Sequence, residues 1–318
     1  MNKNDWNNMH NDPNTQGNVL TALLGAPTRA KASGVAFSLS AILPQVLSII
    51  FIIFTAGLVV EGQEPDWYLY CNYLLPEISF LVVAYFFVQY TKPSIKEVWQ
   101  QQKCPVKYYV IALLLQLGLL SLSSLNTWFL QLLGEFGYTD SGIFLPSMQG
   151  FGFIGVLIVI AVLPALLEEI LFRGILLQGL RSFGQMGSIL LCGALFALYH
   201  QNPAQTLYQF CCGVAFALVA LRAGSVLPTM LAHFVNNALI LTLTKLGIEE
   251  IPVPLQITFL IISALALIGT VSYLVFMDTR NSEKQQDEKS ERKRFWKGAA
   301  AGIAMCALTW LLVFAAGL

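Results

Sequence analysis

Long apolar runs separated by short polar segments dominate the chain. Because a helix needs about 20 mainly apolar residues to cross a bilayer, these runs predict nine membrane segments. Two of them are short for a complete crossing, and the long fourth one contains Pro164, which predicts a kink or a break there. The predicted segments are Val35–Val60, Trp67–Gln89, Tyr108–Leu133, Phe151–Leu180, Gly187–His200, Thr206–Leu221, Val226–Thr244, Leu255–Met277 and Gly298–Leu318.

The same pattern divides the chain into four regions. Residues 1–34 are rich in Asn, Asp, Gln and Thr, which is typical of a disordered tail. Residues 35–277 are predicted to form the transmembrane bundle, 278–297 a charged cytosolic linker and 298–318 a C-terminal membrane helix. The stretch "VLTALLGA" is short and begins late for a signal peptide, so the first membrane segment is expected to act as the insertion signal.

The distribution of basic residues predicts an orientation. With a cytosolic N-terminus, all but two of the 18 lysines and arginines lie in cytosolic segments. The exceptions are Lys245 in an outer loop and Arg173 within a helix, and the outer loops "EGQEPD", "GEFGYTD" and "GIEE" are acidic. The positive-inside rule therefore favours a cytosolic N-terminus, with the C-terminus outside if the last helix spans.

Composition agrees with a membrane protein. Hydrophobic residues make up 56% of the chain and charged residues 11%, whereas soluble domains carry about 25% charged residues. The net charge is zero, so no basic face points to nucleic acid. We expect an all-α, polytopic helix bundle of about eight or nine membrane helices in the cell membrane, with lipid as a partner. The six cysteines have no CxxC spacing and are interpreted as packing residues.

A few ionisable residues interrupt the apolar segments. They cost at least about 2.5–3.5 kcal/mol each in the bilayer core, so they are expected to face the bundle interior and to have functional roles. The acidic ones are Glu77, Glu168 and Glu169, and two of the three histidines, His200 and His233, join them. For Glu77, which follows Pro76, we favour a structural role over a place on a substrate path.

Helical spacing separates the two adjacent glutamates of "LLEEILFRGILL". Glu169 and Arg173 are four residues apart on one face and can pair. Glu168 is rotated by roughly 100° from Glu169, so it can point into a cavity while the pair is held.

Two further motifs place polar groups at a similar depth. In "FALYH", Phe196 and His200 are four apart, and in "HFVNN" both Asn236 and Asn237 can share the face of His233. At 1.5 Å per residue, Glu168 and His200 lie about 20 Å from the cytosolic edge, and the last motif lies about 12–18 Å from it.

These residue types favour hydrolysis of a carbonyl compound. A buried glutamate can act as a general base toward water, and a histidine can orient that water or bind a metal. A histidine and an asparagine can donate hydrogen bonds to an oxyanion. Alternatively, Glu168, His200 and His233 are a common ligand set for catalytic zinc. The chain has neither a GxSxG serine nor an HExxH motif.

Taken together, the three motifs resemble those of the CPBP intramembrane proteases, the family of the type II CAAX prenyl endopeptidases and the bacterial Abi proteins. "EEILFR" resembles the EExxxR motif, "FALYH" the FxxxH motif and "HFVNN" the HxxxN motif, which selects Asn237 over Asn236. The order and spacing match over roughly residues 150–245, the expected protease core.

The resemblance implies a role for each residue. Glu168 would activate the water and His200 would orient it, while His233 and Asn237 would stabilise the oxyanion. Glu169 and Arg173 would brace the site, and Phe196 would pack beside it. Zinc on Glu168, His200 and His233 stays an alternative to a glutamate-only mechanism. The substrate would be a membrane-associated or lipidated peptide or a lipoprotein; prenylated substrates are not assumed, and no oligomeric state is predicted.

Three other interpretations remain. The polar set could form a structural network between helices, or the midplane carboxylates could belong to a transporter, although neither internal repeats nor paired broken helices support one. A third is a family member that acts by binding, as a scaffold or an immunity protein.

Overall fold

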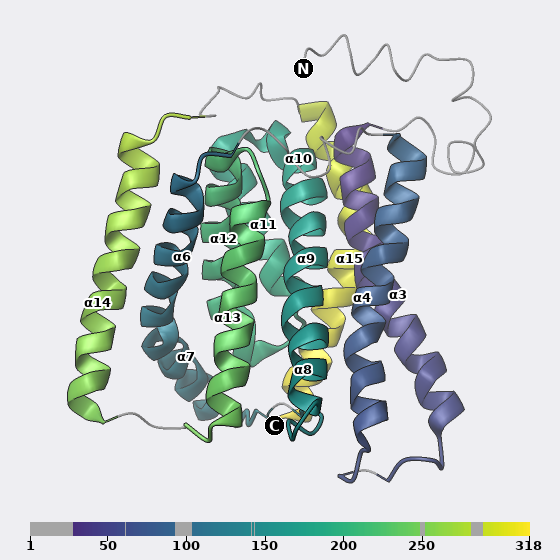
Figure 1. Ribbon diagram of the computed structural model, residues 1–318. Helices are drawn as coiled ribbons and strands as arrows, with labels where there is room; N and C mark the ends of the chain where they lie inside the picture. Colours follow the sequence, from purple (N-terminus) through teal and green to yellow (C-terminus); the bar gives the residue numbers. More distant parts are fainter. Residues whose placement is uncertain are drawn as a thin grey trace.

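A computed structural model describes residues 28–60, 62–92, 104–140, 142, 144–248, 252–280 and 289–318. Across these ranges the chain is helical and forms no strand (Figure 1). Eight of the helices in the described ranges are long and apolar enough to cross a membrane. The predicted all-α, polytopic membrane bundle is therefore confirmed.

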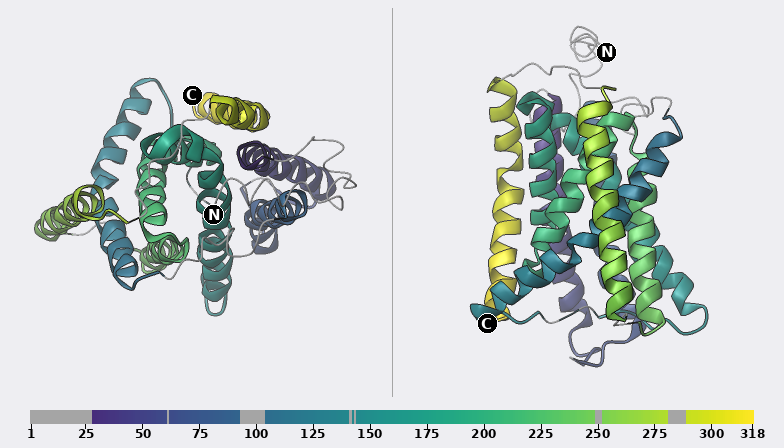
Figure 2. Two further views of the ribbon diagram at one scale, coloured as in Figure 1. Left: turned by 90° about the horizontal axis from the view of Figure 1, so that it is seen from above. Right: turned by 90° about the vertical axis from the view of Figure 1, so that its left-hand side faces the viewer.

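Outer helices enclose a central group (Figure 2). Seen from above, α9, α11, α12 and α13 lie in the middle, with α6, α7 and α14 on one side and α3, α4 and α15 on the other. In Figure 1, α3 begins at the top and α15 ends at the bottom. The outer helices are α3 (Arg29–Thr55), α4 (Asp66–Thr91), α6 (Lys107–Leu119), α7 (Ser123–Glu135), α14 (Val253–Ser272) and α15 (Lys289–Ala316). Short turns continue two of them: a 3-10 turn, Leu120–Leu122, joins α6 to α7, and a π-helical turn, Tyr273–Met277, extends α14.

One continuous helical stretch, Gly152–Tyr199, contains two of the predicted membrane segments. It reverses at Gly184, whose φ of 77° lies in the left-handed region that glycine adopts without strain. Beyond the turn the chain runs antiparallel to itself, because Ser188 Oγ donates to the Leu180 carbonyl at 2.7 Å and Cys192 Sγ lies 3.4 Å from the Phe172 carbonyl. This fold-back accounts for eight helical stretches where the sequence predicts nine segments.

Pro164 neither breaks nor sharply interrupts the long helix. The helix runs continuously in Figure 1 through α8, α9 and α10, and two π-helical turns take up the irregularity. One turn ends just before Pro164, where the missing proline N–H would otherwise disturb the hydrogen-bond ladder. The parts are α8 (Gly152–Val156), a π turn (Leu157–Val162), α9 (Leu163–Glu169), a π turn (Ile170–Leu176), α10 (Leu177–Gly179) and a 3-10 turn (Leu180–Phe183).

Helices α11 (Gly184–Tyr199) and α12 (Thr206–Ala223) form a hairpin that is short for a complete crossing. The 16 residues of α11 rise about 24 Å, less than the roughly 30 Å of a hydrocarbon core. At the tip, Gln201 adopts a left-handed φ of 52°, and Asn202 caps the 3-10 turn Pro203–Gln205. The predicted shortness of these two segments thus reflects a hairpin whose polar tip lies within the bundle. Helix α13 (Leu227–Lys245) follows it.

Two predicted boundaries differ from the structure. Helix α3 begins at Arg29, inside the predicted tail 1–34, because the Thr28 side chain caps it at the Lys31 N–H. Helix α15 begins at Lys289, inside the predicted linker 278–297, because its charged residues are good helix formers and Phe295 is buried against Phe183. The remaining tail residues, 1–27, and the linker residues 281–288 lie outside the described ranges.

Helices α3 and α15 approach until their backbones touch. Gly302 donates its backbone N–H to Ser38 Oγ at 2.9 Å, and Ser38 Oγ donates to the Gly298 carbonyl at 2.6 Å. A Cβ at Gly302 would lie 2.5 Å from the Ser38 Cα, which is backbone and cannot move aside cheaply. Small residues of this kind let membrane helices pack closely.

We expect Gly302→Val to separate α15 from α3 and to lower the free energy of unfolding by about 1–3 kcal/mol. The measurement is thermal unfolding of the purified protein in detergent. Gly269→Val is the matched control, because a Cβ at Gly269 meets nothing within 4 Å and the residue is equally helical. Equal melting temperatures for the two variants would contradict the packing argument.

Candidate active site

Glu169 is the centre of a buried ion-pair cluster. Its Oε1 lies 2.7 Å from Arg173 Nη1, one helical turn away, and 3.1 Å from His233 Nδ1 on α13. Glu169 and Arg173 are both 0% exposed. Because a carboxylate accepts the hydrogen bond, His233 donates through Nδ1, and its Nε2 is left for another partner. The cluster fixes α9 against α13 and sets the orientation of the His233 ring.

Arg173 is also held by aromatic side chains. Its guanidinium carbon lies 4.4 Å from the centre of the Phe196 ring and 5.4 Å from that of Phe216. A desolvated cation over an aromatic face is stabilised by the ring quadrupole. Phe196, predicted to pack beside the site, therefore connects α11 to the buried arginine.

Glu168 differs from its neighbour. It is 9% exposed, and its Oε2 is buried without a hydrogen-bond partner in the described ranges. It lies within electrostatic range of His200, at the end of α11. A buried carboxylate oxygen without a protein partner is costly unless water or a ligand satisfies it. Glu169 Oε2 is likewise buried without a hydrogen-bond partner in the described ranges, so the two adjacent glutamates differ in their charge partners: Glu169 pairs with Arg173, and Glu168 forms no ion pair among the described residues.

His200 caps the C-terminal end of α11 at the hairpin tip. Its Nδ1 lies 2.8 Å from the Phe196 carbonyl, which can only accept, so Nδ1 carries the hydrogen. The Nε2 of the neutral ring is then a free acceptor for a water proton. The short length of the hairpin brings this ring to the middle of the bundle.

The two asparagines of "HFVNN" lie in one hydrogen-bond chain. Asn236 Nδ2 donates to Asn237 Oδ1 at 3.0 Å, and Asn237 Nδ2 donates to the Ile160 carbonyl at 3.2 Å. The sequence alone allowed either asparagine to face the site. In the structure Asn237 is hydrogen-bonded to the long helix that carries Glu168, whereas Asn236 is turned toward α6 and α12.

Sequence analysis missed two members of this chain, Gln116 and Tyr208. Gln116 Nε2 donates to Asn236 Oδ1 at 2.7 Å, and the Tyr208 hydroxyl lies 3.5 Å from the same oxygen. Gln116 interrupts the apolar run "VIALLLQLGLL" on α6 and is only 3% exposed. An amide in the middle of a membrane segment was the available signal, since such a group needs a partner.

Glu77, on α4, lies close to the candidate site. It is 4% exposed, its Oε2 has no hydrogen-bond partner in the described ranges, and it is within electrostatic range of Glu168. Tyr199 is within the same range of both carboxyl groups. Glu77 therefore lies near Glu168, although the sequence alone favoured a structural role for it.

The proposed zinc ligands do not converge. His233 directs Nδ1 toward Glu169 and His200 directs Nδ1 toward a carbonyl, which leaves Nε2 of each ring for water or a metal, and Glu168 comes from a third helix. Among the described residues, no group of three His, Cys, Asp or Glu side chains is arranged to hold a metal ion. Zinc on Glu168, His200 and His233 stays a prediction, and the chemistry below is assigned to the side chains.

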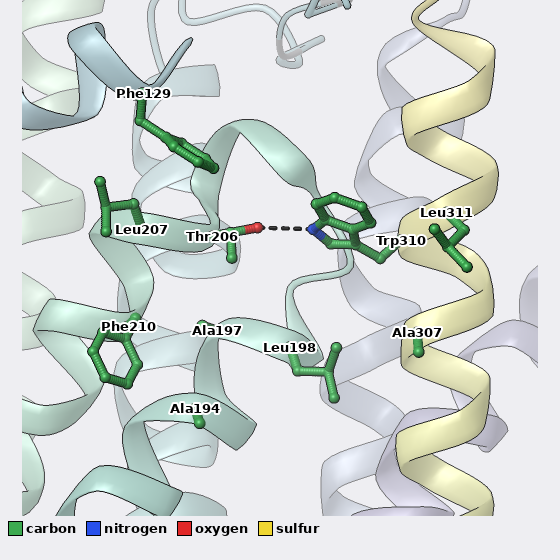
Figure 3. A pocket seen from close by; sticks show the side chains of 10 residues that line it. All are labelled: Phe129, Ala194, Ala197, Leu198, Thr206, Leu207, Phe210, Ala307, Trp310 and Leu311. Carbon is green, nitrogen blue, oxygen red and sulfur yellow. Dashed lines mark hydrogen bonds between the residues drawn. The ribbon is translucent and has the colours of Figure 1, made fainter. Parts of the chain in front are cut away.

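A cavity of about 620 Å³ is lined on α11 by Ala194, Ala197 and Leu198 (Figure 3). Its lining comes from α7, α11, α12 and α15 and is apolar apart from one hydrogen bond, in which Trp310 Nε1 donates to Thr206 Oγ1 at 2.8 Å. Since no ionisable side chain lines it, this cavity is separate from the polar site.

Residues 150–239 match the family model described as Rce1-like, type II CAAX prenyl endopeptidase Rce1-like. Over that segment the chain is similar to this family. The match contains all three motifs and confirms the resemblance drawn from them. No curated protein and no solved structure matched the chain. The Rce1-like family is a protease family, and the eight helices of the described ranges that are long and apolar enough to cross a membrane indicate a multi-pass membrane protein.

Proposed function

We propose that this protein is an intramembrane endopeptidase in which Glu168 activates water to cleave a peptide bond. The observation that carries the proposal is the contrast between the two glutamates. Glu169 is held by Arg173 and His233, whereas Glu168 forms no ion pair among the described residues and its buried Oε2 has no hydrogen-bond partner there. That oxygen is available to a water molecule, and a positioned carboxylate is an effective general base.

The reaction follows from the hydrogen-bonding capacity of each group. Glu168 removes one proton from water while His200 Nε2 accepts a hydrogen bond from the remaining O–H, and the resulting hydroxide attacks the scissile carbonyl carbon. The carbonyl oxygen becomes an oxyanion, to which the Asn237 amide donates. His233 can donate from Nε2 once that nitrogen carries a proton, because the Glu169 carboxylate offsets the added charge. Glu168 then returns its proton to the leaving amine as the C–N bond breaks, leaving an acid and an amine.

The substrate that we propose is a membrane-associated peptide, with a prenylated C-terminal CAAX peptide as the first candidate, because the matched family consists of CAAX-type endopeptidases. The protein would lie in the cell membrane with its N-terminus in the cytosol, since nearly all basic residues would then be cytosolic. In this orientation the turn at Gly184 faces the cytosol.

Purified protein in lipid vesicles tests the activity. The substrates are a farnesylated CAAX peptide, the same peptide without the prenyl group and a hydrophobic transmembrane peptide, and cleavage is followed by mass spectrometry. We expect cleavage of the farnesylated peptide. Flux of solutes across the vesicles without proteolysis would support a transporter, and binding without cleavage would support a scaffold.

Metal removal separates the glutamate mechanism from the zinc alternative. We expect activity to survive dialysis against a chelator and elemental analysis to find no stoichiometric zinc, because no group of three His, Cys, Asp or Glu side chains among the described residues is arranged to hold a metal ion. If zinc is present at one per chain, and if it and the activity are lost together in His233→Ala, the glutamate mechanism is wrong.

A further inference from the structure

The Asn237 amide is held from both sides, by its neighbour Asn236 on α13 and by a backbone carbonyl of the long helix. On one side, its Oδ1 accepts from Asn236 Nδ2 at 3.0 Å. On the other, its Nδ2 donates to the Ile160 carbonyl at 3.2 Å. An asparagine amide has two N–H donors, and in the described ranges the second one has no partner.

The Ile160 carbonyl is available to Asn237 because of Pro164. Proline has no backbone N–H, so a carbonyl four residues before it lacks its usual α-helical donor. Ile160 stands four residues before Pro164, within the π-helical turn Leu157–Val162. The irregularity in the long helix thus provides an acceptor for a side chain of another helix, on the same helix that carries Glu168.

The Asn236 amide is itself held by side chains of two other helices. Its Oδ1 accepts from Gln116 Nε2 on α6 at 2.7 Å and lies 3.5 Å from the Tyr208 hydroxyl on α12. With its oxygen occupied in this way, the Asn236 amide must present its N–H groups to Asn237. The hydrogen bonds therefore all have the same donor-to-acceptor direction, from Gln116 to Asn236, from Asn236 to Asn237 and from Asn237 to the Ile160 carbonyl.

We propose that Gln116 and Asn236 are positioning residues that hold the Asn237 amide with one N–H turned toward the oxyanion. The inference rests on the proposed peptidase function. It adds to the candidate site two residues that do not define any of the three motifs. Neither Gln116 nor Asn236 touches the substrate; both act through the orientation of Asn237. Without them, the Asn237 amide can rotate, and its oxygen rather than its N–H can face the oxyanion.

The first test is kinetic and uses the farnesylated CAAX peptide in vesicles. Loss of an oxyanion donor lowers kcat by about 10²–10³-fold, and we expect that loss for Asn237→Ala. Gln116→Met and Asn236→Leu leave the donor present but loosely held, so kcat should fall by about tenfold with KM within about twofold. Thr242→Val is the matched control on α13, because the Thr242 hydroxyl bonds only to the Ala238 carbonyl of its own helix.

A double-mutant cycle distinguishes positioning from general loss of structure. If Gln116 acts only through Asn237, Gln116→Met should lower kcat no further in the Asn237→Ala background. A full additional tenfold loss in that background would overturn the inference, as would wild-type kcat in both Gln116→Met and Asn236→Leu.

A second measurement does not depend on proteolysis. In protein labelled with ¹⁵N-asparagine, the side-chain signal that is absent from Asn237→Ala identifies the Asn237 amide. We expect Gln116→Met to speed hydrogen exchange at this amide by about fivefold, the value of one net hydrogen bond. Unchanged hydrogen exchange at the Asn237 amide would overturn the positioning role of Gln116 even if peptidase activity is found. Faster exchange in Gln116→Met, together with no cleavage by the wild-type protein, would support the positioning role and contradict the proposed function.

Discussion

Glu168→Gln should lower kcat for the farnesylated peptide by about 10²–10⁴-fold, the range that general base catalysis supplies. The amide has the same shape as the carboxyl group but cannot take the proton from water. Because Glu168 Oε2 has no protein partner in the described ranges, the substitution breaks no hydrogen bond there, and the melting temperature should stay at the wild-type value. Initial rates in vesicles and a thermal unfolding curve measure the two effects.

Glu77→Gln is the comparison for this experiment. Glu77 is buried to a similar degree and lies in the same electrostatic neighbourhood, but we assign it a structural role. We expect it to retain most of the wild-type kcat. Cleavage that continues in Glu168→Gln at matched folding would remove Glu168 from the mechanism.

Arg173→Met should cause the largest loss of stability, about 3–5 kcal/mol, because it leaves the Glu169 charge buried with only His233 beside it. The double variant Arg173→Met with Glu169→Gln removes both charges and should recover much of that loss. Unfolding in detergent, followed by circular dichroism, measures these differences.

An exposed pair provides the control for the buried one. Arg294 pairs with Glu291 near the start of α15, and its side chain is 51% exposed. Arg294→Met should therefore change stability by only about 0–1 kcal/mol. If the two arginine variants are equally stable, the buried pair does not hold α9 and α13 together as inferred.

The membrane helices could be predicted from sequence because their signal is composition over a long window. Hydropathy located every apolar segment, and only the ends moved, as at Arg29, where the Thr28 cap begins α3 earlier. In the sequence, the fold-back at Gly184 and the short hairpin were visible only as apolar segments of unusual length. The π-helical turns could not be foreseen, because proline predicts a disturbance of the ladder but not how the chain absorbs it.

The candidate site was predictable where residues are linked by helical spacing. Glu169 and Arg173 are one turn apart, and their pair follows from that spacing. The contact between His233 and Glu169 joins helices separated by the whole hairpin, and spacing says nothing about it. Gln116 was missed for the same reason, since its partner Asn236 lies on a distant helix. The catalytic roles of these residues stay predictions.

The short α11–α12 hairpin has a consequence for biogenesis. Its tip carries polar groups into the apolar layer, where Gln201 Nε2 lies 3.6 Å from Cys306 Sγ and Thr206 Oγ1 accepts from Trp310. Both partners belong to α15, which the ribosome makes after every motif helix. The tip therefore gains its last hydrogen bonds only when α15 docks. In a nascent chain that lacks α15, His200 lies at a hairpin tip whose hydrogen bonds are incomplete. We therefore expect the protein to reach its final fold only after α15 has inserted.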